Sequence, residues 1–177
     1  MRGLVVVLAT IAVACGSGST LAPRPSAARA LSLSSPAFSP GGSIPSRFTC
    51  DGAGTSPPLS WSHVGHAGSL VLVVTDPDAP GGTFVHWVAY GIDPRVTALH
   101  AGEIPPGAFQ GTNDFGHTGY GPPCPPVGDP PHHYVFHLFA LASGTRLPGP
   151  GASAGDVLSA IDDHAVAEGT LTARYSR

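Results

Sequence analysis

The sequence predicts a mostly β fold with a single helix, built as one domain. Its 177 residues are enough for one domain with a core, and 42% of them are hydrophobic. Its 24 glycines and 20 prolines separate compact apolar runs, a pattern typical of short strands joined by tight turns. Apolar residues recur at helical spacing in one segment, residues 153–167, so we expect strands and loops elsewhere in the domain.

The charge pattern argues against one class of partner. Only 11% of the residues are charged, the formal net charge is −3, and no cluster of basic residues occurs in the sequence. Proteins that bind nucleic acids carry basic patches that neutralise phosphates. We therefore expect no nucleic-acid partner.

The first residues have the pattern of an export signal. Arg2 precedes an apolar run over residues 4–14, which is too short to cross a bilayer. The run ends in Ala-Val-Ala-Cys, which resembles a bacterial lipobox, although Ala12 stands where leucine is usual. In such a signal the chain is cut before the cysteine, here Cys15, and the cysteine sulfur carries a lipid.

This interpretation divides the chain into three parts. We expect a signal peptide over residues 1–14, the lipid-modified cysteine and a tether over 15–30, and a folded domain over 31–177. The protein would then be exported and held by its lipid anchor at the outer face of the cell membrane. Two alternatives remain open: an ordinary secretory signal, which would give a secreted protein, and a buried core segment.

Three β-branched or aromatic runs predict the main strands of the domain, at residues 69–75, 84–92 and 133–141. A further short strand is expected at residues 171–175. Residues 100–131 are rich in glycine and proline and are expected to form a long ordered loop. Loops of this length in compact domains are usually functional or disordered.

Ser153 is predicted to begin the helix. Its hydroxyl can cap the first turn, with Asp156 three residues later. The surrounding residues also match the G-x-S-x-G pattern of serine hydrolases, in which a strand leads directly to the serine. Pro148 and Pro150 precede Ser153, and prolines do not occupy a central strand. The serine is therefore predicted to be a helix cap and not a nucleophile.

Two segments place ionisable side chains at the ends of predicted strands. In the first, Asp76 and Asp78 follow a strand and His86 lies in the next, where alternation would put Phe84, His86 and Val88 on one face. The second is the proline-rich segment that leads into the strand at 133–141. There the alternation places three side chains on one face, His132, Tyr134 and Phe136, and three on the other, His133, Val135 and His137.

These segments carry several motifs in a fixed order. They are D-P-D-A-P at 76–80, His-Trp at 86–87, G-Y-G-P-P-C-P-P at 119–126 and H-x-Y at 132–134. Together with S-P-A-F at 35–38, F-T-C-D-G at 48–52 and S-P-P-L-S-W at 56–61, they resemble the bacterial, Raf kinase inhibitor-like branch of the phosphatidylethanolamine-binding protein family. The resemblance runs from about Leu31 to the C-terminus and departs at Pro122, where glycine is usual.

The resemblance implies a β-sandwich-like fold with a short C-terminal helix and a shallow anion-binding pocket. It also implies which residues of this chain line that pocket. They are Asp76, Asp78, His86, Cys124, Pro125, Pro126, His132 and Tyr134.

The chemistry of these residue types suits an anion. Two imidazoles can offer N–H donors, a neighbouring carboxylate such as Asp76 favours the protonated ring, and Tyr134 adds a hydroxyl. No lysine or arginine lies in either motif, so we expect modest affinity that rises as the pH falls. A zinc site formed by Asp76, His86 and His132 is a weaker alternative, because no H-x-x-x-H or C-x-x-C spacing supports it. We expect no cofactor.

The sequence contains three cysteines, Cys15, Cys50 and Cys124. If Cys15 is lipid-modified, the other two form an even pair in an oxidising compartment, where a disulfide can form. Buried free thiols are also common, so the sequence leaves both states open.

The sequence as a whole predicts an exported, non-enzymatic lipoprotein that binds a small anion, such as a phosphate or a phospholipid headgroup. A first alternative is an inhibitor or regulator that contacts an envelope protein, of kinase or protease type, through the pocket rim. A second is a hydrolase that uses the histidines and aspartates, although the sequence offers no evident nucleophile.

Overall fold

The computed structural model describes residues 29–162 and 164–177. The expected signal peptide, Cys15 and nearly all of the expected tether lie outside the described residues. Among the described residues, no helix is both long enough and apolar enough to cross a membrane.

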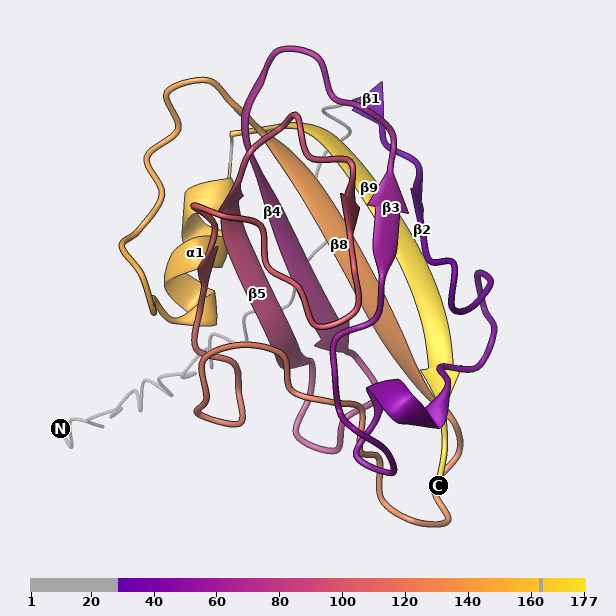
Figure 1. Ribbon diagram of the computed structural model, residues 1–177. Coiled ribbons are helices and arrows are strands. Elements are labelled where there is room, and N and C mark those ends of the chain that lie inside the picture. The colour runs from indigo at the N-terminus through magenta and orange to yellow at the C-terminus, as the bar shows by residue number, and fades with distance from the viewer. Residues whose placement is uncertain (1–28, 163) are drawn as a thin grey trace, which may run out of the picture.

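Two β-sheets and one α-helix make up the described part of the chain (Figure 1). The larger sheet has the strand order β1-β9-β8-β4-β5-β7, and the smaller has the order β2-β3-β6. The elements in chain order are β1 (Arg29–Ala30), β2 (Leu33–Ser34), the 3-10 helix η1 (Ser46–Phe48), β3 (Leu59–Trp61), β4 (Ala67–Asp76), β5 (Phe84–Ile92), β6 (Ala98–Leu99), β7 (Phe109–Gln110), β8 (His132–Ala142), α1 (Ala154–Ile161) and β9 (Ala165–Tyr175).

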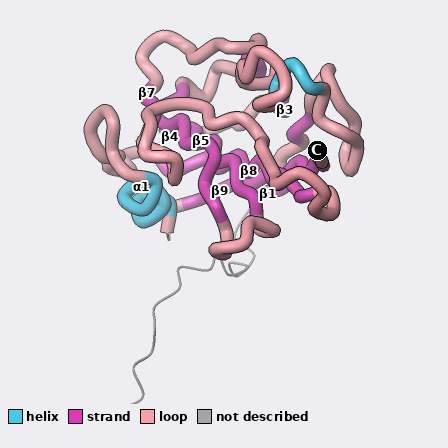
Figure 2. The backbone as a smooth tube through the Cα atoms, turned by 90° about the horizontal axis from the view of Figure 1, so that it is seen from below, coloured by secondary structure: helices cyan, strands magenta, loops and turns pink. Residues whose placement is uncertain are grey.

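The larger sheet is buried on both faces. One face packs against the smaller sheet in the main core, which includes Leu72, Trp87 and Phe136. The other face packs against α1 in a second, smaller core that includes Val73 and Val157. In the end-on view of Figure 2, α1 and β3 lie on opposite sides of the long strands. This layering confirms the predicted mostly β architecture with one short helix.

The three main strands were predicted correctly, and the end of the helix was not. The predicted helix over residues 153–167 ends at Ile161, and β9 begins at Ala165 instead of residue 171. The reason is tertiary pairing, because Ala165 lies opposite Leu141 of β8 in the sheet. Ala165 packs against the small core, as its place in the apolar pattern predicted. It does so from a strand, however, and not from the predicted helix.

A β-bulge in β5 changes which side chains share a face. Val74 of β4 pairs with Trp87, whereas Thr75 pairs with Val85, so His86 is the extra residue. Phe84 and His86 remain neighbours, with ring centroids 5.2 Å apart. Val88, predicted to share their face, packs instead in the small core beside Val85. The strict alternation assumed from the sequence fails at the bulge.

Candidate functional site

The candidate site lies where four strand ends of the larger sheet meet. Asp76 ends β4, Phe84 begins β5, His132 begins β8, and Tyr175 ends β9 opposite His132. Because neighbouring strands of this group are antiparallel, the end of one lies beside the start of the next. The two motifs that are far apart in the sequence are therefore brought together at one end of the sheet.

His132 is held by a buried carboxylate. Its Nδ1 lies 2.8 Å from Oδ2 of Asp76, and the two residues are 5% and 3% exposed. The other Asp76 oxygen accepts a hydrogen bond from the backbone N–H of Asp78 at 2.9 Å. An ionised carboxylate can only accept, so Nδ1 of His132 carries the proton. The ring nitrogen left for a ligand is Nε2.

His86 is oriented in the same way by a backbone carbonyl. Its Nδ1 donates to the oxygen of Gly121 at 2.9 Å, and the residue is 4% exposed. Burial lowers the pKa of His86, against the opposing effects of the Gly121 carbonyl and the Asp76 charge. Here too, Nε2 is the nitrogen that the Gly121 bond does not use.

This geometry refines the expectation that both imidazoles donate to an anion. In each ring the Nδ1–H is already engaged by the protein. A neutral ring therefore presents only the Nε2 lone pair, which accepts. Each Nε2 becomes a donor only when the ring is protonated, so donation by either histidine requires a positive charge on it.

Tyr134 packs against His86 and lies on the same face of β8 as His132. It is completely buried, and its ring centroid lies 5.2 Å from that of His86. Its hydroxyl has no hydrogen-bond partner of ordinary geometry among the described residues. Burial, followed by the Asp76 charge, raises the pKa of Tyr134. The hydroxyl stays protonated at neutral pH and can donate.

Aromatic side chains line one side of the site. Phe84 and Phe115 lie 4.7 Å apart, and Phe115 lies 5.3 Å from His86 in an edge-on arrangement. Phe115 packs directly on Gly121, where any Cβ atom would overlap its ring. The ring is nevertheless 42% exposed, so it forms an apolar edge next to His86.

Asn113 arranges the loop that carries Phe115. It is 4% exposed, and its side-chain N–H donates to the carbonyl of Gly119 at 2.9 Å. Its side-chain oxygen accepts from the backbone N–H groups of Phe115 at 3.0 Å and His117 at 3.2 Å. Sequence reasoning missed Asn113 and Phe115. An asparagine among the glycines of a long loop was the available signal, since this residue often hydrogen-bonds nearby backbone.

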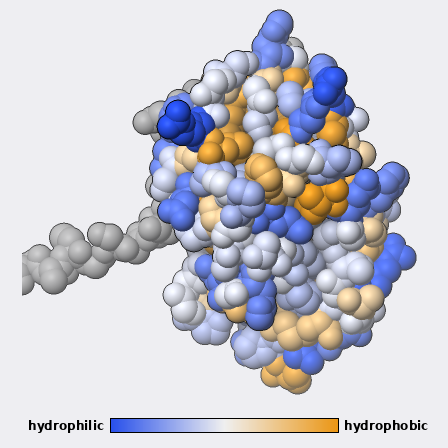
Figure 3. Space-filling model, turned by 60° about the vertical axis from the view of Figure 1, so that its left-hand side comes forward, coloured by the Kyte–Doolittle hydropathy of each residue, from blue (hydrophilic) through white to orange (hydrophobic). Residues whose placement is uncertain are grey.

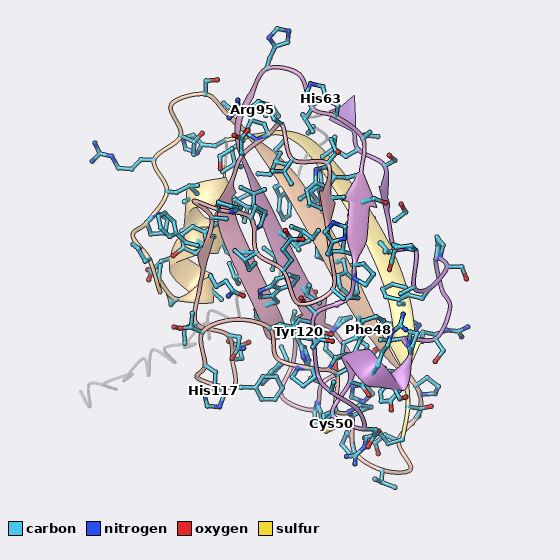
Figure 4. The ribbon with its side chains drawn as sticks, viewed as in Figure 1. Phe48, Cys50, His63, Arg95, His117 and Tyr120 are labelled. Atoms are coloured by element: carbon cyan, nitrogen blue, oxygen red, sulfur yellow. A yellow bond between two sulfur atoms is a disulfide. The ribbon has the colours of Figure 1, made fainter. Side chains whose placement is uncertain are left out.

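The proline-rich segment is cross-linked to the N-terminal part of the domain. Cys50 and Cys124 form a disulfide with their Cα atoms 5.4 Å apart, which settles the choice between a bridge and free thiols. The backbone N–H of Cys50 also donates to Pro123, and the Tyr120 hydroxyl donates to Phe48. Figure 4 shows Phe48, Cys50 and Tyr120 at this end of the molecule.

The other predicted residues of the segment, Pro125 and Pro126, follow Cys124 directly. Pro125 is buried, whereas Pro126 is exposed, and no contact of either ring with the histidines is described. The carbonyl of Pro126 accepts a hydrogen bond from Asp129 at 3.3 Å, which turns the chain back toward β8.

Asp78 has a different partner from the other predicted residues. One of its carboxylate oxygens accepts from both the backbone N–H and the ring Nδ1 of His133, at 2.7 and 2.8 Å. The backbone bond is the main cause that lowers the pKa of Asp78. The structure therefore joins Asp78 to His133, on the opposite face of β8 from His132, where it fixes the loop after β4.

The described residues include no group of three histidine, cysteine, aspartate or glutamate side chains that could hold a metal ion. The serine of the G-x-S-x-G match caps α1, as predicted. The Ser153 hydroxyl accepts from the N–H of Asp156 at 3.1 Å and donates to the Asp156 carboxylate at 2.7 Å.

A family model, related sequences and a solved structure all resemble this chain. The family model described as phosphatidylethanolamine-binding protein matches residues 34–176. A protein of Methanothermobacter thermautotrophicus, named UPF0098 protein, is 47% identical over 153 residues, which cover 83% of this chain and 99% of that protein. The lipoprotein-named LppC of Mycobacterium tuberculosis is 42% identical over 149 residues, covering 84% of this chain and 74% of LppC.

The fold agrees with a solved structure as well. The phosphatidylethanolamine-binding protein homologue CT736 of Chlamydia trachomatis superposes with a TM-score of 0.77 at 40% identity, covering 84% of this chain and 98% of CT736. The family model matches most of the chain, over residues 34–176. The chain therefore belongs to the phosphatidylethanolamine-binding protein family.

Proposed function

We propose that this chain is an exported, non-enzymatic protein, lipid-anchored through Cys15, that binds a small phosphate-type anion at His86, His132 and Tyr134. Export is supported by the lipobox-like residues, by the likeness to the lipoprotein-named LppC and by the disulfide, since disulfides persist in oxidising compartments. The single observation that carries the binding proposal is the buried Tyr134 hydroxyl, which lies near the Asp76 carboxylate but makes no hydrogen bond of ordinary geometry to any described residue.

A ligand oxygen would satisfy this hydroxyl. Leaving a buried polar group unpaired costs about 1–3 kcal/mol, so Tyr134 gains from any acceptor that reaches it. The two histidines each keep Nε2 free of the bond that orients the ring, and when charged they would donate to the same anion. Three donors from β5 and β8 would then converge on one phosphate group.

This arrangement predicts binding that strengthens as the pH falls. The ligand needs protonated imidazoles, and the buried His86 has a lowered pKa, so protonation is incomplete at neutral pH. Calorimetric titration of the full chain with inorganic phosphate and with phosphorylethanolamine should give a smaller Kd at pH 5.5 than at pH 8. A Kd that does not change over this range would contradict the proposed mechanism.

The variants His86→Ala and His132→Ala, combined in one protein, should abolish binding of both compounds. His63→Ala is the matched control, because His63 is exposed and lies at the far end of the molecule (Figure 4). The control should bind phosphate as the unmodified protein does. Binding retained by the double variant would place the ligand elsewhere.

A regulatory role through a protein partner is the second candidate. Val127 is 76% exposed on the loop between the disulfide and β8, where a partner could reach it. On the face drawn in Figure 3, apolar residues form several separate patches. If the loop contacts a partner, Val127→Asp should abolish that complex and leave phosphate titration unchanged.

A further inference from the structure

The two halves of the Cys50–Cys124 disulfide differ in accessibility. Cys124 is exposed, whereas Cys50 is half-buried. An N–H of the Arg177 guanidinium donates to the Cys124 sulfur at 3.5 Å, and the same side chain pairs with the Asp51 carboxylate at 3.1 Å. The pair with Asp51 holds Arg177 beside the sulfur that an external thiol can reach. A cation next to a sulfur favours its thiolate form, so Cys124 is the half of the bridge better suited to carry a negative charge.

The disulfide lies three residues along the chain from the group that orients His86. Both polar backbone groups of Gly121 bond to His86. The Gly121 N–H donates to the His86 carbonyl at 2.8 Å, and the Gly121 carbonyl accepts from Nδ1 of the ring at 2.9 Å. Pro122 and Pro123 separate Gly121 from Cys124, and a proline ring fixes the backbone torsion φ. Because this connection is stiff, a displacement of Cys124 also displaces Gly121.

The disulfide is the covalent link between this segment, residues 119–124, and the N-terminal part of the domain. The hydrogen bonds described between the two parts are neutral ones. The N–H of Cys50 donates to the Pro123 carbonyl at 3.1 Å, and the Tyr120 hydroxyl donates to the Phe48 carbonyl at 3.0 Å. The long strands β4, β5, β8 and β9 pair with one another without the segment. Opening the disulfide should therefore loosen residues 119–124 and leave the larger sheet intact.

We propose that the Cys50–Cys124 disulfide is a dithiol-sensitive control on the orientation of His86. In the first step a thiolate of the dithiol attacks the Cys124 sulfur, the S–S bond breaks, and its electron pair leaves on the Cys50 sulfur. The second thiolate of the dithiol then attacks the reductant sulfur bound to Cys124, which releases the Cys124 thiolate beside Arg177. The dithiol ends as an internal disulfide and has given two electrons to the protein. Its two thiols lose one proton each, of which Cys50 takes up one and the solvent the other.

Hydrogen exchange of the full chain, before and after treatment with excess dithiothreitol, tests this control. The protection of the Gly121 amide should fall by about tenfold, because its bond to His86 then depends on a segment without its cross-link. Gly111 is the matched control, since its N–H donates to Val88 of the same strand at 2.9 Å and lies outside residues 119–124. The protection of Gly111 should not change. Titration of free thiols, with two more in the treated chain than in the untreated one, measures how completely the bridge is open.

The rate of reduction tests the part played by Arg177. Arg177→Gln should slow the release of thiols by about fivefold, the effect of one unit charge beside a sulfur near the protein surface. Arg174→Gln is the matched control, because Arg174 is exposed on β9 and its side chain donates to the Gly41 carbonyl at 2.9 Å. Equal rates in the two variants would contradict the role given to Arg177.

Three results would overturn the inference. They are a disulfide that resists dithiothreitol in the folded protein, release of thiols with unchanged protection of Gly121, and equal losses of protection at Gly121 and Gly111. The last result would make the bridge a general stabiliser of the fold.

The consequence for a ligand rests on the proposed function. Calorimetry should show phosphate binding about tenfold more weakly to the reduced chain, because a loosely held His86 ring is a poorer donor. If neither form binds phosphate but Gly121 loses protection, the proposed function fails and the disulfide control stands. If both forms bind phosphate equally and Gly121 keeps its protection, the control fails and the proposed function stands.

Discussion

His132 and His137 lie five residues apart on opposite faces of β8. His132 is surrounded by carboxylates, whereas His137 packs against an aromatic ring. His132 is bonded to the Asp76 carboxylate at 2.8 Å and has a second carboxylate, Asp129, at 3.9 Å. His137 is stacked on Phe139 with ring centroids 6.0 Å apart, and its Nδ1 makes no hydrogen bond to a described residue. Its nearest described carboxylate oxygen, on Glu168, is 3.8 Å away. Burial alone lowers the pKa of His137 to about 4.

The comparison separates burial from function. Both rings are largely shielded from water, but only His132 has a partner that fixes its tautomer and leaves a defined nitrogen for a ligand. A histidine held mainly by apolar contacts is a packing residue that stays neutral. We call the face of the larger sheet that packs against the smaller sheet and carries His132 the site face, and the face that packs against α1 the helix face. Four predictions test the difference between them, from the largest expected effect to the smallest.

The site face is cross-linked, and the helix face is not. Replacing Cys50 and Cys124 by serine removes a bridge between residues 74 positions apart, which should lower the free energy of unfolding by about 4 kcal/mol. Urea denaturation measures this loss, and the unmodified protein under reducing conditions should reproduce it. A loss below about 1 kcal/mol would show that the loops hold this end without the bridge.

Lowering the pH should destabilise the fold mainly through protonation of His137 on the helix face. The pKa of His137 is about 4 in the folded state and about 6.5 in an unfolded chain, so the unfolded state takes up the proton first. The free energy of unfolding should therefore fall between pH 6.5 and 4, by up to about 3 kcal/mol. In His137→Phe this part of the pH dependence should disappear in urea denaturation at pH 7 and 4.5. An unchanged dependence would assign the acid sensitivity to the site face, where burial also lowers the pKa of His86.

Removing the carboxylate partner should cost more on the site face than on the helix face. Asp76→Asn leaves the buried Nδ1–H of His132 without its charged acceptor, which should destabilise the fold by about 2 kcal/mol and weaken phosphate binding. Glu168→Gln is the matched change near His137, and its half-exposed carboxylate should contribute less than about 0.5 kcal/mol. Equal losses in thermal or urea denaturation would remove the distinction between the two faces.

Ser153→Ala has the smallest expected effect. It removes the cap of α1 on the helix face and should lower the free energy of unfolding by about 1 kcal/mol. Phosphate titration should be unchanged, because Ser153 bonds only to its own helix among the contacts described for its side chain. Any loss of phosphate binding would link the helix to the site.

The sequence predicted what depends on local pattern. The runs at residues 69–75 and 84–92 are strands because β-branched residues suit a buried sheet, and β5 begins and ends as predicted. The side of β8 that carries His132 and Tyr134 followed from simple alternation. The motifs were sufficient to identify the family.

What the sequence did not reveal depends on contacts between distant segments. The bulge at His86 arises from the register of β4 against β5, and the early end of α1 arises from β8 against β9. Asp78 was predicted to lie in the pocket, but its hydrogen bonds to His133, 55 positions away, were not predicted. Phe115 reaches His86 because Asp114 bonds to the backbone of Val85. Such pairings have no signature within a window of neighbouring residues.

The parallel pairing of β1 on β9 bears on how an anchored protein would face its surroundings. Arg29 lies opposite Ala167 of β9, and His132 lies opposite Tyr175 of the same strand. Tyr175 is eight positions beyond Ala167, which is about 26 Å along an extended strand. The described chain thus enters the domain at the end opposite the site, as Figure 1 shows for β1 and the C-terminus. In a domain attached to a membrane through Cys15, we expect the site to point away from that bilayer. It would then sample solutes, or an opposing surface, before the headgroups of its own membrane.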